Sequence, residues 1–237
     1  MNCNTYYNTK AFAAKAFGIF ILFFLVSQYV IAHPAPDELN KMSKTEVSYL
    51  YLLLGYKHIL PWGIDHILFV VSLFLLSPKL KPVLWQATAF TIAHTITLGL
   101  SMYKIIVPPA AIVEPVIALS ILYVALENIF SPTLKKSRIG IVFLFGLIHG
   151  MGFASALSEI GLPKNAYFTS LIMFNIGVEL GQLTVILISL ILFRKLYLLI
   201  ANKFTKAPDY RKNIVIPVSA IIAAIALYWT IERIFFV

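Results

Sequence analysis

Long apolar runs, separated by short polar or basic stretches, fill most of the chain. Six of these runs approach or exceed the ~20 residues that a helix needs to cross the hydrocarbon core of a bilayer. They cover about residues 63–78, 83–103, 112–130, 139–158, 167–193 and 213–236. The pattern therefore predicts an all-α polytopic membrane protein with about six transmembrane helices.

Residues 1–32 have the features of a secretory signal peptide. Lys10 and Lys15 precede an apolar stretch that ends at Ala32, a small residue of the kind found before a cleavage site. We therefore expect cleavage after this segment. An uncleaved segment would instead be an N-terminal anchor helix and would raise the number of transmembrane helices to seven.

Residues 33–62 connect this segment to the membrane domain. Their polar first part predicts a periplasmic leader, and residues 47–60 predict an interfacial helix. Pro61 lacks the amide hydrogen that a helix interior requires, so we expect the helix to end there. The six-helix membrane domain then covers residues 63–237.

The composition supports a membrane protein and excludes several other classes. Hydrophobic residues make up 60% of the chain, charged residues make up 12%, and the mean hydropathy is +0.87. A soluble enzyme, a disordered chain or a coiled coil would need far more polar surface. The single cysteine, Cys3, precludes a disulfide within the chain, so a metal site would use nitrogen and oxygen ligands.

The basic residues indicate the orientation in the membrane. A net charge of +9 would suggest nucleic-acid binding in a soluble protein, but here the basic residues lie between apolar runs. We therefore expect the lipid bilayer, and no nucleic acid, as a partner. Loops rich in Lys and Arg alternate with poorer loops, which predicts that the rich loops are cytoplasmic, that the mature N- and C-termini are periplasmic, and that the protein lies in the bacterial inner membrane. The rich loops contain Lys79 and Lys81, then Lys135, Lys136 and Arg138, and finally the basic residues from Arg194 to Lys212.

Ionisable side chains inside the apolar runs predict the functional site, because each is costly in lipid unless it faces a partner or a water-filled cavity. Asp65 and His66 begin the first of the six runs, and His58 lies across a proline–glycine break as a weaker candidate. His94 and His149 fall at a similar depth in later runs. Imidazole and carboxylate without thiolate suit a borderline divalent metal such as nickel, cobalt or zinc.

The run at 167–193 carries the strongest single pattern. Asn175, Glu179 and Gln182 lie at i, i+4 and i+7, which places them on one helix face. A buried carboxylate needs a partner, and the expected partners of Glu179 are His94 and His149. The predicted metal ligands are therefore His58, Asp65, His66, His94, His149 and Glu179, with Thr91, Glu114, Asn175 and Gln182 as supporting polar residues.

Other residues have structural interpretations. Two pairs of glycines spaced by four residues predict close packing between helices. Glu127 and Asn128 fall near the cytoplasmic end of their run, where we expect the side chains to reach toward the interface. The glycine pairs are Gly146 with Gly150, and Gly177 with Gly181.

Five segments together resemble the HupE/UreJ family of membrane proteins. The resemblance implies a nickel permease of the inner membrane with a functional link to a nickel enzyme, hydrogenase or urease. It also implies that Asp65, His66 and His149 handle the metal, with His58 as the leading histidine of the motif. Ile59 and Ala154 stand where the family has proline and glutamate, which marks an outlying branch. The segments are HILPWGIDHILF at 58–69, AFTIAHT at 89–95, the helix at 114–128, LIHGMGFA at 147–154 and FNIGVELGQ at 174–182.

Three functions fit these residues. A secondary transporter of Ni²⁺, Co²⁺ or Zn²⁺ is favoured over an enzyme, because weak, exchangeable ligands permit release and no Gly-x4-Gly-Lys-Ser/Thr motif occurs in the sequence. No tightly bound cofactor is then expected. The alternative is an intramembrane zinc-dependent hydrolase that holds Zn²⁺ with the same histidines and carboxylates. In the third, the buried polar residues only pack helices together.

Overall fold

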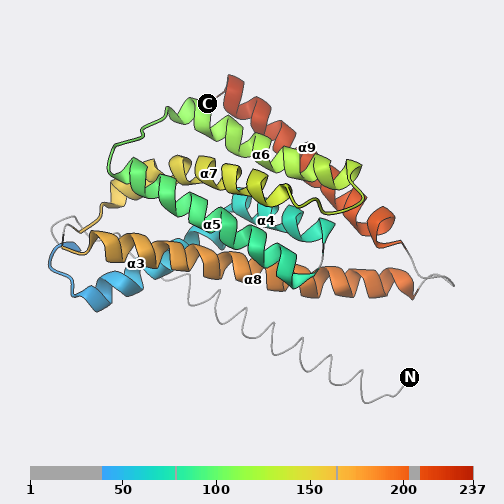
Figure 1. Ribbon diagram of the computed structural model, residues 1–237, viewed down its shortest axis with the longest axis horizontal. Helices are drawn as coiled ribbons and strands as arrows, with labels where there is room; N and C mark the ends of the chain where they lie inside the picture. Colours follow the sequence, from blue (N-terminus) through green and yellow to red (C-terminus); the bar gives the residue numbers. More distant parts are fainter. Residues whose placement is uncertain (1–38, 78, 164, 203–208, 237) are drawn as a thin grey trace, which may run out of the picture. The chain divides into compact units, whose positions relative to one another are not determined.

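Every regular element in the described part of the chain is a helix, as predicted. The computed structural model describes residues 39–77, 79–163, 165–202 and 209–236; the predicted signal segment and Cys3 lie outside these residues. The helices are α3 (Lys44–Ile59), α4 (Ile64–Leu76), α5 (Leu80–Met102), α6 (Ala110–Phe130), α7 (Arg138–Ile160), α8 (Tyr167–Ala201) and α9 (Ile216–Phe235), with a π-helical turn, η1 (Arg211–Val215), before α9 (Figure 1).

Five of these helices, α5 to α9, are long and apolar enough to cross a membrane. The 13 residues of α4 extend only about 20 Å, which is shorter than the ~30 Å hydrocarbon core. Together with α3, from which it is bent by 68°, α4 meets the same criteria of length and composition as a single broken span. The predicted polytopic all-α membrane fold is therefore confirmed, and a sixth span requires both α3 and α4.

The helix boundaries follow from local chemistry. Ser43 and Glu46 form a reciprocal capping box that starts α3, because each side chain accepts from the other residue's backbone amide. Pro61 and Gly63 lie in the break after α3. The predicted end of the run at 193 was too early, because α8 continues to Ala201 with its basic residues exposed on the helix surface.

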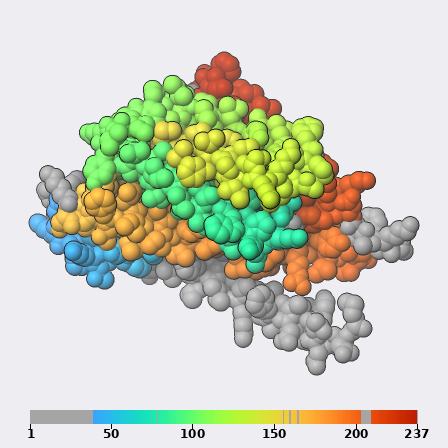
Figure 2. Space-filling view, viewed as in Figure 1, coloured from blue at the N-terminus to red at the C-terminus, as the bar shows by residue number. Residues whose placement is uncertain are grey.

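The helices pack chiefly in three pairs, α5 with α7, α3 with α8, and α6 with α9 (Figure 1). The face seen in Figure 2 shows α5 and α7 side by side. The glycines lie at the closest approaches: Gly146 and Gly150 face the backbone of α5, and Gly177 faces the backbone of α3. Gly181 packs against the side chain of Ile59. Lipid supplies no hydrophobic driving force for helix association. Small residues at these positions let the helix backbones approach closely, so that van der Waals packing can hold them together.

A buried polar network joins α4, α6 and α7 at the start of α7. The Arg138 guanidinium is 1% exposed and donates to Asn128 Oδ1 at 3.0 Å and to the Ser72 carbonyl at 3.3 Å. It also lies 3.4 Å from the Glu127 carboxylate. The expectation that Glu127 and Asn128 reach toward the interface is therefore wrong, because Arg138 gives both a buried partner.

We expect Gly150→Ala to lower the thermal stability of the protein. An added Cβ would strike the carbonyl oxygen of His94 and the hydroxyl of Thr97, and overpacking of this kind costs about 1–3 kcal/mol. Gly140→Ala is the matched control on the same helix, because a Cβ at Gly140 has nothing within 4 Å. Thermal unfolding of both purified variants tests this. Equal midpoints would mean that α5 and α7 do not approach as closely as described.

Candidate metal centre

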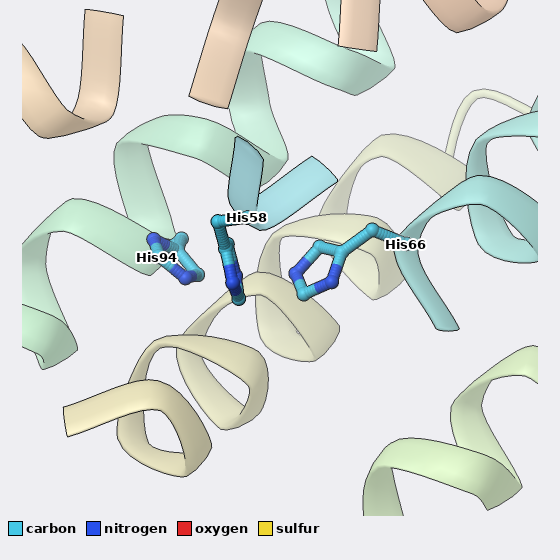
Figure 3. A group of neighbouring side chains, drawn as sticks. All are labelled: His58, His66 and His94. Atoms are coloured by element: carbon cyan, nitrogen blue, oxygen red, sulfur yellow. The ribbon is translucent and has the colours of Figure 1, made fainter. Parts of the chain in front are cut away.

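Three histidines from three helices converge inside the bundle. His58 of α3, His66 of α4 and His94 of α5 each offer a ring nitrogen, and the three nitrogens lie within 4.8 Å of one another. Figure 3 shows the ring of His58 between the other two. Its centroid is 4.5 Å from that of His66 and 5.9 Å from that of His94. We call these three residues the histidine group.

The bend between α3 and α4 brings two of its members together. His58 lies in the last turn of α3 and His66 in the first turn of α4, on either side of the break at Pro61 and Gly63. A Cβ at Gly63 would strike the carbonyl oxygen of His58, so a residue with a side chain would open this turn. His58 is the weaker candidate of the sequence analysis, and the break is what places its ring beside that of His66.

The surroundings of the histidine group are aromatic. The rings of Phe153 and Phe174 lie 3.8 Å and 5.7 Å from that of His58, and the ring of Phe90 lies 5.8 Å from that of His66. His66 is 6% exposed and His94 is fully buried. This apolar shell limits access of water and strengthens electrostatic interactions inside it.

Hydrogen bonding leaves the lone pair of one His94 nitrogen available. The Asn175 amide nitrogen donates to the Leu171 carbonyl at 2.8 Å, so its oxygen faces His94 Nδ1 at 3.2 Å. An amide oxygen only accepts, so Nδ1 carries the ring hydrogen and Nε2 carries the lone pair. A ligating histidine usually donates its other ring N–H to such an acceptor.

The Nε2 atoms of His58, His66 and His94 are buried and have no hydrogen-bond partner in the described part of the protein. A buried polar atom without a partner costs about 1–3 kcal/mol, so one such atom on each residue of the histidine group needs an explanation. A cation bound between them would satisfy all three.

His149 extends this cluster but lies outside the histidine group. Its ring centroid is 5.0 Å from that of His66. The Ser120 hydroxyl donates to the Ile117 carbonyl at 2.6 Å and therefore accepts from His149 Nε2 at 2.9 Å. Nδ1 of His149 then carries a lone pair and has no partner among the described residues.

The structure places Asp65 with a different partner, Arg233 in the last turn of α9. The guanidinium donates to both carboxylate oxygens of Asp65, at 3.0 and 2.9 Å. It also lies 3.4 Å from the Glu114 carboxylate. Sequence reasoning missed Arg233, although a basic residue inside the last apolar run was a signal of a buried partner.

The predicted polar face of α8 lies against two threonines of α5, Thr88 and Thr91. Thr88 donates to the Glu179 carboxylate at 2.8 Å, and Thr91 donates to Gln182 Oε1 at 3.3 Å. The expected pairing of Glu179 with His94 and His149 is replaced by this bond to Thr88. Thr88 is six residues from His94, or about 9 Å along the helix axis.

Comparison with known proteins identifies one family. Residues 36–233 match the family described as HupE / UreJ protein. Comparisons with curated proteins and with solved structures find no match.

We expect Arg233→Gln and Asp65→Asn to be energetically coupled. Each variant alone leaves an ionic group of the pair without its partner, whereas the double variant removes both charges. The coupling energy, measured by unfolding in mixed micelles, should exceed about 1 kcal/mol. Additive effects of the two substitutions would show that the pair contributes no specific stabilisation.

We expect Asn175→Leu to weaken binding of Ni²⁺ by about 10–100-fold, the usual cost of losing the residue that orients a ligating histidine. Titration calorimetry on the purified protein measures this. Ser189→Ala, also buried in α8 and two turns beyond Gln182, is the control and should bind like the wild type. Unchanged affinity in Asn175→Leu would mean that His94 is not a ligand.

Proposed function

We infer, from the premise that the chain belongs to the HupE/UreJ family, that it transports a divalent transition metal across the bacterial inner membrane, with nickel as the first candidate. The family is associated with nickel or cobalt transport or with an accessory function. The observation that carries the proposal is the convergence of one ring nitrogen from each of three histidines inside the bundle, where each of these residues also has a buried Nε2 without a partner in the described part of the chain.

The donor set supports this class of metal. Imidazole suits nickel, cobalt and zinc, whereas magnesium and calcium prefer oxygen ligands and copper(I) prefers sulfur. Two nitrogens bound to one ion lie at most about 4.2 Å apart, twice the ~2.1 Å length of a metal–imidazole bond. The group spans up to 4.8 Å, so a small inward rotation of the rings completes the site.

Carboxylates on both sides of the histidine group support a path through the bundle. The carboxylates of Asp65 and Glu114 lie next to the Arg233 guanidinium and form ion pairs with it. An arriving divalent ion competes with Arg233 for these carboxylates before it reaches His66. Glu179, bonded to Thr88 of α5, offers the next carboxylate toward the other end of α5.

The positions of two basic loops support the orientation. Lys81 and Lys135 line one cavity and so lie at the same end of the bundle. Basic loops collect on the cytoplasmic side. We therefore propose that this end is cytoplasmic, that both termini are periplasmic, and that the metal moves inward.

A zinc hydrolase is the second candidate, because three histidines with an open fourth position are also the donor set of some catalytic zinc sites. The two functions differ in how long the metal stays. A hydrolase retains stoichiometric zinc through purification, whereas a transporter exchanges its ion with added metal.

We expect cells that express the protein to take up labelled Ni²⁺ in a saturable manner. His58→Gln and His94→Gln each remove one nitrogen donor while keeping side-chain size and polarity, and should lower uptake at least tenfold at matched membrane levels. Ser189→Ala should keep wild-type uptake. Competition with Co²⁺ and Zn²⁺ ranks the substrates.

Two outcomes would contradict transport. Wild-type uptake equal to that of empty-vector cells, with zinc retained in the purified protein, would point to the hydrolase. Histidine variants that lower only the thermal midpoint, and change neither uptake nor metal binding, would make the histidines packing residues.

A further inference from the structure

One arginine side chain bridges two carboxylates near one end of the bundle. Arg233 Nη2 donates to both carboxylate oxygens of Asp65, at 3.0 and 2.9 Å. Its Nη1 donates to the Glu114 carbonyl at 3.2 Å and lies 3.4 Å from the Glu114 carboxylate. No other cation of the described residues pairs with either carboxylate, so these three side chains carry one excess negative charge. We call Asp65, Glu114 and Arg233 the arginine group.

The arginine group lies toward the end of the bundle opposite the basic loops. Because α6 ends shortly before Lys135, Glu114 near its start lies toward the other end. The side chains of Arg233, Asp65 and Glu114 are 17%, 23% and 37% exposed, so the group is accessible from outside the bundle. Asp65 directly precedes His66 in the sequence. A cation that enters from this end therefore meets the arginine group before it reaches the histidine group.

Arg233 also has contacts that do not involve a carboxylate. Its guanidinium carbon lies 5.5 Å from the centre of the Trp229 ring, within the range of a cation–π interaction. The bond from Nη1 to the Glu114 carbonyl is a second such contact. Both can persist when another cation takes the carboxylates. The ion pairs can therefore exchange without leaving the guanidinium unpartnered.

We propose that Arg233 excludes monovalent cations from the two carboxylates and yields them only to divalent ions. A potassium or sodium ion carries no more charge than the guanidinium and lacks its directed hydrogen bonds, so it does not displace Arg233. A divalent ion doubles the attraction to each carboxylate at a given distance. This inference rests on the proposed transport function. It makes Arg233 a specificity-determining residue that selects by charge, whereas the histidine group selects among divalent ions by its nitrogen donors.

Nickel entry into vesicles in two salts tests the proposal on the full chain. The purified protein is reconstituted into vesicles that contain a Ni²⁺-sensitive dye, with the same salt inside and outside so that no membrane potential forms. The salt is KCl or N-methylglucamine chloride, whose organic cation is bulky, at equal ionic strength. Initial rates give the half-saturating Ni²⁺ concentration in each salt.

Arg233→Gln removes the competing guanidinium. In N-methylglucamine chloride its half-saturating Ni²⁺ concentration should fall about fivefold below that of the wild type, the factor that corresponds to the coupling energy expected above for the pair with Asp65. KCl should raise this value again, because potassium now reaches the carboxylates, whereas the wild type should have the same value in both salts.

Two further variants make the test specific. Arg233→Lys keeps the charge but not the planar pair of donor nitrogens, so its half-saturating concentration should fall only about twofold and stay insensitive to KCl. Lys104→Asn is the matched control, because it removes an exposed cation from the loop between α5 and α6, at the same end as Glu114. Asparagine tolerates the positive φ of 58° at this position. This control should behave like the wild type in both salts.

The outcomes separate this inference from the proposed function. Wild-type vesicles that take up no Ni²⁺ in either salt would overturn the transport function and this inference with it. Saturable wild-type uptake with an unchanged half-saturating concentration in Arg233→Gln would overturn the inference alone, as would an unchanged value in Arg233→Lys if Arg233→Gln does not fold. An equal effect of KCl on the wild type and Arg233→Gln would also overturn it.

Discussion

Close approach of helix backbones around the histidines is the constraint on which the candidate metal centre depends. A Cβ at Gly150 would strike the carbonyl of His94, one at Gly63 would strike that of His58, and one at Gly177 would strike that of Leu52. A backbone carbonyl cannot turn aside as the end of a flexible side chain can, so these contacts fix the backbone around the histidine group. The candidate site is held by packing, and the Nε2 atoms of its three histidines have no hydrogen-bond partner in the described part of the protein.

The polar groups inside the bundle fall into two classes by hydrogen bonding. Arg138 is buried and paired with Asn128, and Arg233 is half-buried and paired with Asp65. The Nε2 atoms of the histidine group are buried and lack such partners in the described part. Paired groups join helices whatever the protein does. Unpaired groups gathered at one point are costly for stability, so they indicate ligand binding more directly than burial or charge alone.

Much of the fold could be predicted from the sequence, because apolar runs have a fixed length and proline and glycine interrupt them. The helix ends of α6 and α7 fall within two residues of the expected ones. The bent α3–α4 pair could not be predicted, since α4 alone resembles an ordinary apolar run until its 13 residues are compared with the bilayer thickness. Contacts between helices could not be predicted either. The side chain of Asn128 was expected to point toward the interface, but it accepts a hydrogen bond from Arg138, ten residues further along the chain.

The candidate site was predicted in composition and only partly in arrangement. His66 and His94 were placed by depth, and the structure brings their rings to 6.1 Å. Depth does not tell which side of a helix faces which neighbour, so Asp65 was grouped with the histidines although its carboxylate turns to Arg233, 168 residues further along the chain. Asp65 and His66 are neighbours in the sequence but lie on different faces of α4, because successive residues on a helix point about 100° apart.

The separation of the carboxylates from the histidine group affects how tightly a metal would be held. Three neutral imidazoles can coordinate a divalent ion, but the group contains no carboxylate among the described residues to neutralise its charge. A net double charge in an aromatic, poorly hydrated environment is disfavoured, which weakens binding below that of a site with mixed nitrogen and oxygen ligands. The carboxylates instead stand apart, Asp65 at Arg233 and Glu179 at Thr88. An arrangement with coordination at the centre and counter-charge displaced to either side favours short residence and onward movement of the ion, which is what conduction requires. A resident cofactor would be served better by the opposite arrangement, with a carboxylate inside the ligand set.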